Sequence, residues 1–164
     1  MVINRMGLLE AQPIRKMLET KERHEESGTS YGLTEAGYDI RVKQDIYFTS
    51  DGVLVKEDEN IMIHGAGNFT IASAIEEFQM PEHLVGIVHD KSTWARQGLS
   101  VFNTVIEPNW KGFLTLELVY HGQKYLHIPA GSGIAQVIFH TLHEDAYYSG
   151  KYQNQPDRPV GAIT

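Results

Sequence analysis

One acidic residue interrupts an apolar stretch in the second half of the chain. Within residues 113–119, alternation places Glu117 on the face opposite to Leu116 and Leu118. A carboxylate on the inner face of a strand is costly unless it is paired or functional, and a positioned carboxylate can act as a general base. Exposure to solvent is the commoner arrangement, and alternation permits it. The strand therefore carries a candidate base whose burial the sequence leaves open.

A second cluster of polar side chains follows an apolar strand in the middle of the chain. It combines the cations of Lys91 and Arg96 with the hydroxyls of Ser92 and Thr93. Hydroxyls and backbone amides at the start of a helix, with a cation nearby, make a cradle for phosphate. A helix N-cap by Asp90 or Ser92, with both cations in solvent, explains the same residues without a ligand.

Two further segments are weaker candidates. Trp110 follows a Pro-Asn turn, where it can belong to the core or form a wall against a sugar ring. Lys151 and Gln155 lie in a polar tail, where such residues usually have no specific role. None of these segments identifies a site by itself.

Composition limits the chemistry that these residues can perform. The chain has no cysteine, which excludes disulfides, thiolate zinc sites and cysteine nucleophiles. Its net charge of -7 argues against non-specific binding to duplex nucleic acid, but it does not exclude a small anionic substrate. No apolar run approaches the ~20 residues of a membrane span, and the N-terminus has no features of a secretory signal. We therefore expect a cytoplasmic protein that binds neither nucleic acid nor membranes.

The elements that would position these residues are mostly short strands. The 164 residues suit one domain. Hydrophobic spacing predicts a helix near Leu8 to Leu18, with Pro13 in its first turn, then a polar loop over residues 21–34. A second short helix is expected over residues 92–97. Alternation and turn signals predict strands over residues 38–42, 45–48, 52–55, 60–63, 69–75, 84–89, 100–103, 112–120, 125–128 and 134–141.

The predicted fold is therefore mainly β, as a sandwich, jelly roll or distorted barrel with few short helices. The tail over residues 146–164 is polar and aromatic, and Pro156 and Pro159 prevent regular structure there. We expect this tail to add little to a core and to be either disordered or ordered by a ligand or a neighbouring chain.

Taken together and in order, the motifs resemble the deoxycytidine triphosphate (dCTP) deaminase branch of the dUTPase superfamily. Each motif alone is weak, but the resemblance covers nearly the whole chain. The matching segments are AGYDIR at residues 36–41, KSTWAR at 91–96, IEPNWKG at 106–112, LE at 116–117, GSGIAQ at 131–136 and KYQNQ at 151–155.

The resemblance implies a distorted β jelly roll that assembles as a homotrimer, with active sites between subunits and a flexible tail that closes over the nucleotide. It implies deamination of dCTP to dUTP and ammonia in pyrimidine deoxynucleotide metabolism. Glu117 would be the general base for the attacking water, with no protein-bound metal. The zinc-dependent deaminases need His and Cys ligands, which this chain cannot provide in full. Mg²⁺ would arrive with the triphosphate, and dTTP is a family inhibitor.

The resemblance also assigns roles to individual residues. Ser92 and Arg96 would act with Glu117 by positioning the water and polarising the ring, and Trp110 would pack on the deoxyribose. The remaining predicted nucleotide contacts are Lys91, Thr93, Lys151 and Gln155 at the phosphates, Tyr148 or its neighbour Tyr147 also at a phosphate, Val105 at the base, and Thr104 and Glu107.

Departures from the family pattern concern Lys91, the loop before Trp110, and Glu107. Lys91 replaces an arginine, so a point charge stands where a bidentate fork is usual. The loop is shorter than in the family, which leaves open whether a 5-substituted cytosine is accepted. Glu107 replaces an aspartate that activates water in dUTPases. Its extra methylene can misplace a water, and ~1 Å of misplacement can cost ~100-fold in rate.

We therefore favour deamination alone. The alternatives are a bifunctional deaminase that continues to dUMP, a dUTPase, and a non-catalytic nucleotide-binding trimer. A sugar-binding or structural jelly roll would leave the tail motif as a coincidence.

Overall fold

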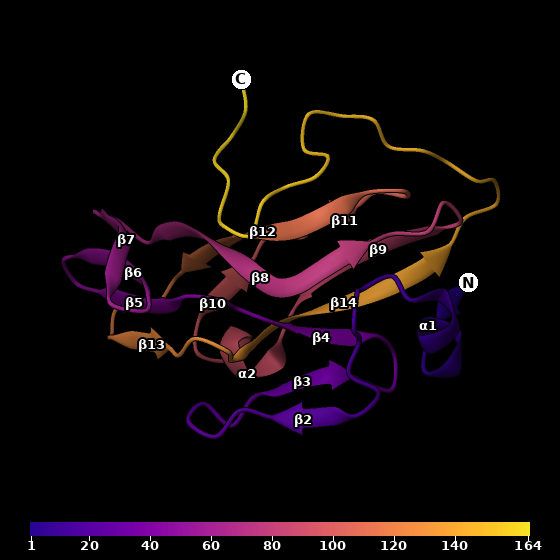
Figure 1. Ribbon diagram of the computed structural model, residues 1–164. Helices are drawn as coiled ribbons and strands as arrows, with labels where there is room; N and C mark the ends of the chain where they lie inside the picture. The colour runs from indigo at the N-terminus through magenta and orange to yellow at the C-terminus, as the bar shows by residue number, and fades with distance from the viewer.

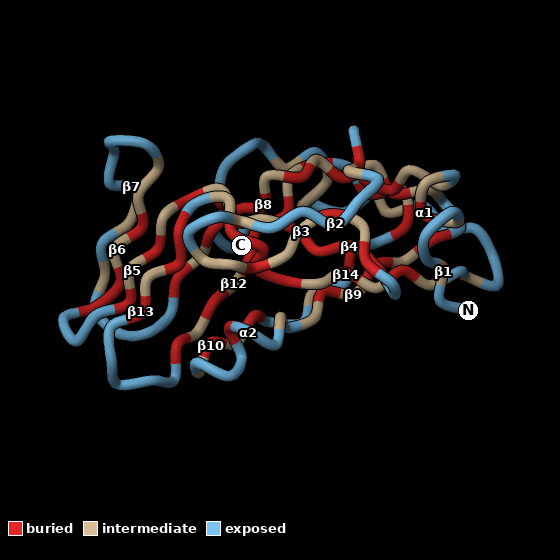
Figure 2. The backbone as a smooth tube through the Cα atoms, turned by 90° about the horizontal axis from the view of Figure 1, so that it is seen from below, coloured by how far each residue is buried: buried red, intermediate tan, exposed pale blue.

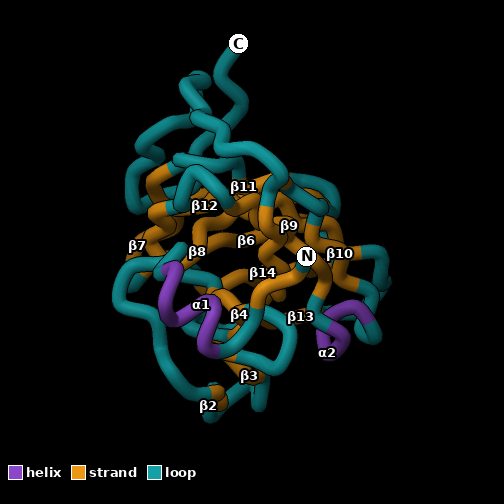
Figure 3. Tube along the Cα trace, turned by 90° about the vertical axis from the view of Figure 1, so that its right-hand side faces the viewer, coloured by secondary structure: helices purple, strands orange, loops and turns teal.

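The computed structural model describes residues 1–164 and contains three antiparallel sheets with two short helices at their margins (Figure 1 and Figure 3). The largest sheet has the order β11-β9-β14-β4-β3-β2, with β1 paired to β14. The second sheet has the order β10-β12-β8, and the third has the order β13-β5-β6-β7. No helix is long and apolar enough to cross a membrane.

The bounds of these elements are as follows. The helices are α1 (Met6–Ala11) and α2 (Ser92–Ala95). The strands of the largest sheet are β1 (Val2–Ile3), β2 (Lys21–Arg23), β3 (Ser30–Leu33), β4 (Tyr38–Arg41), β9 (Leu84–Asp90), β11 (Val105–Ile106) and β14 (Gly133–Thr141). The other strands are β5 (Asp45–Thr49), β6 (Gly52–Glu57), β7 (Asn60–Gly65), β8 (Phe69–Gln79), β10 (Leu99–Val101), β12 (Lys111–Tyr120) and β13 (Leu126–Ile128).

The core lies where the apolar faces of these strands meet. Alternation of buried and partly buried residues runs along β8, β9, β12 and β14, as the red and tan segments of Figure 2 show. Ile40, Phe78, Leu118 and Phe139 are completely buried there. Every strand predicted between residues 38 and 141 is present, as is the short helix α2. In most of these strands the apolar periodicity matches a face that the core buries, whereas β7 has no buried residue and is held by its pairing with β6.

The first 34 residues differ from the prediction. The first helix ends at Ala11, and Pro13 follows it instead of forming its first turn. Gln12 ends the helix with left-handed backbone dihedrals. Because Pro13 disfavours the right-handed helical region for the residue before it, the helix does not continue through Gln12. The expected loop over residues 21–34 is wrong, because β2 and β3 pair there as a hairpin. All three residues of β2 are exposed, so this edge strand has no alternating apolar pattern to predict it.

A buried ion pair joins β4 to β8. Glu76 has a 3% exposed side chain, and its carboxylate accepts hydrogen bonds from Nε of Arg41 at 2.8 Å and from the Arg41 backbone N–H at 2.9 Å. Burial raises the pKa of Glu76, and the guanidinium of Arg41 opposes that rise. The pair therefore compensates a charge that water cannot reach.

Removal of one partner should destabilise the fold strongly. We expect Arg41→Ala to lower the free energy of unfolding by about 3 kcal/mol at neutral pH, because it leaves the Glu76 carboxylate buried without a counter-ion. Urea unfolding measures this loss, and the deficit should shrink at acidic pH as Glu76 becomes protonated. Arg15→Ala is the matched control, since the exposed Arg15–Glu77 pair should contribute less than about 1 kcal/mol. Equal losses in both variants would contradict the prediction.

Candidate active site

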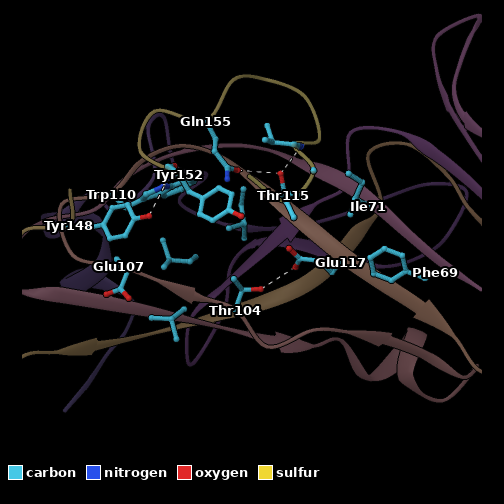
Figure 4. A pocket seen from close by; sticks show the side chains of 16 residues that line it. Phe69, Ile71, Thr104, Glu107, Trp110, Thr115, Glu117, Tyr148, Tyr152 and Gln155 are labelled. Atoms are coloured by element: carbon cyan, nitrogen blue, oxygen red, sulfur yellow. Dashed lines mark hydrogen bonds between the residues drawn. The ribbon is translucent and has the colours of Figure 1, made fainter. Parts of the chain in front are cut away.

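A pocket of about 610 Å³ opens between β12, β11 and the tail (Figure 4). Its wall is largely apolar, with two carboxylates and several hydroxyls. The lining residues are Phe69, Ile71, Thr104, Val105, Ile106, Glu107, Trp110, Leu114, Thr115, Glu117, Tyr148, Tyr152, Gln155, Val160, Gly161 and Ala162. None of these side chains is a cation, so the pocket of a single chain is acidic.

Glu117 projects from β12 into this pocket. A bulge between Phe113 and Thr115 shifts the register of β12 on β8, and beyond it Glu117 pairs with Ile71. The carboxylate is half-buried, and the Thr104 hydroxyl lies 3.3 Å from its Oε2. Burial raises the pKa of Glu117, while hydrogen bonds from the backbone and from Thr104 oppose the rise. A raised pKa makes the ionised carboxylate a stronger base, which suits it to accept a proton from water.

Trp110 both belongs to the core and lines the pocket. Its side chain is 5% exposed and packs against the ring of Phe78 with 6.1 Å between centroids. Its indole Nε1–H donates to the carbonyl of Tyr152 at 2.6 Å. The two interpretations of Trp110 therefore do not exclude each other: the ring is fixed by the core and still forms a pocket wall.

Glu107 supplies the second carboxylate of the pocket. It is exposed, and it forms no salt bridge with any cation of the chain. Val105 lies beside it with 51% of its surface exposed. Figure 4 shows Glu107 and Glu117 at separate places along the same cavity.

The tail is ordered by contacts within its own chain. The sequence predicts a tail that is either disordered or ordered by a ligand or a neighbouring chain, and the structure shows neither. The Tyr148 N–H donates to the Pro108 carbonyl at 3.0 Å, and the Asn154 N–H donates to the Lys111 carbonyl at 2.9 Å. Gln155 forms a parallel bridge with Gly112. Figure 1 shows the tail, in yellow, folded over β11 and β12. Its Tyr148 and Gln155 thus reach the pocket without a second chain or a ligand.

The cations that the sequence assigns to phosphate lie outside the pocket lining. Lys91 is almost buried, and its ammonium contacts the carboxylate of Asp39 and the hydroxyl of Ser30, the latter at 2.9 Å. Lys151 contacts the backbone carbonyl of Ile163 and the ring of Tyr152. The Lys91 ammonium is therefore paired with a carboxylate within the chain, whereas Lys151 has no carboxylate partner and stays exposed.

Helix α2 presents its polar residues to solvent. Ser92, Thr93 and Arg96 are exposed, while Trp94 anchors the helix by donating from Nε1 to the Gly133 carbonyl at 2.7 Å. The N-cap prediction for Asp90 or Ser92 is wrong. Lys91 occupies the N-cap without a side-chain cap, and Asp90 accepts from the Val101 N–H at 2.7 Å instead.

Comparison with known protein families identifies the family of this chain. A family model described as "dCTP deaminase-like" matches residues 8–142. This protein belongs to the dCTP deaminase-like family. The chain is 34% identical to the dCTP deaminase of Paramagnetospirillum magneticum in an alignment that covers 87% of this chain and 91% of that protein. It is 32% identical to the dCTP deaminase of Chlamydia trachomatis serovar L2, covering 92% and 96% of the two chains.

Solved structures show that this dCTP deaminase-like chain has a dUTPase-like fold. The EIAV dUTPase matches with a TM-score of 0.52 at 20% identity, covering 86% of this chain and 92% of that chain. A mutant dUTPase from phage phi11 of S. aureus matches with a TM-score of 0.55 at 14% identity, covering 84% and 95%. The predicted mainly β, jelly-roll-like fold is confirmed, with open sheets rather than a closed barrel.

Several pocket residues of this dCTP deaminase-like protein were not predicted from the sequence. Phe69 and Ile71 come from β8, Thr115 from β12, and Tyr152 and Val160 from the tail. The register of β8 on β12 brings the first two beside Glu117, and no local pattern reports that register. The chain contains no cluster of three His, Asp or Glu side chains that could hold a metal ion.

Proposed function

We propose that this protein converts dCTP and water into dUTP and ammonia in the pocket beside β12. The observation that carries the proposal is the half-buried carboxylate of Glu117, which projects into an apolar pocket and is held by a hydroxyl instead of a cation. Membership of the dCTP deaminase-like family and the named relatives support the same reaction.

In the proposed reaction, Glu117 accepts a proton from a water whose oxygen attacks C4 of the cytosine ring. The same carboxyl then passes that proton to the exocyclic nitrogen, and the C4–N bond breaks as ammonia leaves. The proton that remains on the C4 hydroxyl moves to N3, so C4 becomes the carbonyl carbon of the uracil ring. No step needs a protein-bound metal, and the donor set of the chain fits this route because it has no cysteine and no metal-binding cluster. Mg²⁺ would enter only with the triphosphate.

The pocket offers a place for each part of the nucleotide. The base would lie at the Glu117 end, near Val105, and the deoxyribose would pack on Trp110. The triphosphate would extend towards Tyr148 and Gln155. In this arrangement the tail, which already covers the pocket, closes over the nucleotide.

A second copy of the chain would complete the site. A triphosphate requires cations, and no lysine, arginine or histidine lines the pocket. Ser92 and Thr93 on α2 and Arg96 directly after it are exposed and contribute nothing to the pocket of their own chain. We therefore propose a homotrimer in which α2 of a neighbouring subunit brings these residues to each Glu117.

Glu107 supports one further candidate function, hydrolysis of dUTP to dUMP in the same pocket. Its carboxylate is exposed there without a counter-ion, so it is available to a water near the phosphates. The longer glutamate side chain makes this second reaction the weaker proposal.

Product analysis with Mg²⁺ and dCTP, dUTP or 5-methyl-dCTP tests both activities. Ammonia and dUTP as the only products of dCTP would support deamination alone, while pyrophosphate and dUMP would support the bifunctional reaction. Conversion of 5-methyl-dCTP would extend the substrate class to 5-substituted cytosines, and addition of dTTP would test inhibition. If none of the three nucleotides is consumed, the proposed function is wrong.

A further inference from the structure

The backbone of Thr104 is held between two sheets beside Glu117. The Val88 N–H on β9 donates to the Thr104 carbonyl at 3.0 Å. Two residues earlier, the Phe102 N–H donates to the Glu117 carbonyl on β12, also at 3.0 Å. The segment is thus attached on both sides, so the place of the Thr104 hydroxyl is set by the fold.

That hydroxyl has two acceptors within hydrogen-bond distance. Its Oγ1 lies 3.3 Å from Oε2 of Glu117 and 3.1 Å from the carbonyl oxygen of Phe102. Thr104 is the only residue whose side chain hydrogen-bonds to the Glu117 carboxylate, and Oε1 has no side-chain partner. Figure 4 shows the contact at the edge of the pocket.

The Thr104 hydroxyl can donate to Glu117 in both of the protonation states that the proposed reaction requires. When Glu117 is ionised, Thr104 donates to the charged Oε2. When Oε1 holds the proton taken from water, Oε2 is a carbonyl oxygen and still accepts from Thr104. The contact to Oε2 thus keeps one orientation of the carboxyl throughout the transfer and leaves Oε1, which has no side-chain partner, for the reacting atoms.

We propose that Thr104 is a positioning residue that holds the general base Glu117 in both protonation states, instead of contacting the nucleotide. The inference rests on the proposed function and replaces the contact that the sequence resemblance implied for Thr104. A hydrogen bond to an ionised carboxylate is stronger than one between neutral groups, so Thr104 favours the ionised form. It therefore opposes the effect of burial on the pKa of Glu117.

Thr104→Val and Thr104→Ser test this role, because valine keeps the shape without the hydroxyl and serine keeps the hydroxyl. We expect Thr104→Val to lower kcat about 10- to 100-fold with KM almost unchanged, since a misplaced base is poorly aligned with its proton. Loss of the hydrogen bond raises the pKa of Glu117, so the acidic limb of kcat/KM should move to higher pH. Thr104→Ser should restore both the rate and the limb.

Thr70→Val is the matched control. Thr70 is buried in β8, its hydroxyl donates to the Ile71 carbonyl at 3.3 Å, and it does not line the pocket. Its replacement should leave kcat and the acidic limb unchanged. A Thr104→Val enzyme with unchanged kcat would overturn the inference, and a raised KM alone would identify Thr104 as a nucleotide contact.

A ¹³C NMR titration of the Glu117 carboxyl separates this inference from the proposed function. If the wild-type protein releases no ammonia from dCTP, the proposed reaction fails. A higher Glu117 pKa in Thr104→Val than in the wild type would still support the positioning contact. An identical titration of Glu117 in both proteins would overturn it.

Discussion

Glu117→Gln is expected to reduce ammonia release from dCTP by about a thousandfold, in the range of general acid–base catalysis. Glutamine has the same shape and can still accept a hydrogen bond from Thr104, but it cannot take a proton from water. Binding of dCTP with Mg²⁺, measured by calorimetry, should persist, so kcat falls more than affinity. Activity above a tenth of the wild-type value would show that Glu117 is not the base.

The pH dependence of the wild-type enzyme should report the same group. Burial raises the pKa of Glu117, and the base must be ionised to act. The acidic limb of kcat/KM should therefore lie above the ordinary glutamate pKa of ~4.3. Ionisation of a carboxyl whose pKa is raised in the folded state lowers the stability of the folded protein. The denaturant midpoint of unfolding of Glu117→Gln should therefore be no lower than that of the wild type at neutral pH. Glu144→Gln, an exposed change of equal charge, serves as control.

Two inactive variants should restore activity when they are combined. Arg96→Ala and Glu117→Gln are each expected to be nearly inactive as single species. If each site takes Glu117 from one subunit and Arg96 from its neighbour, random co-assembly leaves about a quarter of the sites intact. Ammonia release by the co-expressed pair should therefore exceed that of either variant many times over.

The structure gives a physical reason to expect this recovery. The pocket of one chain holds two carboxylates and no cation, while Arg96 is exposed at the end of α2 and does not line the pocket. Co-expression of Glu117→Gln with Glu117→Ala is the control and should yield no recovery, because both chains lack the base. If the mixture of Arg96→Ala and Glu117→Gln also recovers no activity, Arg96 does not act across subunits.

In the first 34 residues, apolar spacing predicts which side chains are buried but not the backbone structure that buries them. Leu8, Ile14 and Met17 are all buried, as their spacing indicated, yet only Leu8 is helical. The apolar spacing correctly predicts the burial of these residues, but beyond Pro13 irregular backbone carries them instead of a helix. The β2 strand is wholly exposed, and its backbone pairing with β3 has no counterpart in hydropathy.

Alternation and turn residues are local properties, so the order of amino acids is enough to predict the strand pattern of the core and the order of the motifs. It also placed Glu117 within a strand. The direction in which that carboxylate faces depends on contacts between distant segments, since alternation allows either face to be the buried one. The bulge in β12, its pairing with β8 and the attached Thr104 segment direct Glu117 into a pocket, and these are contacts between residues far apart in the chain.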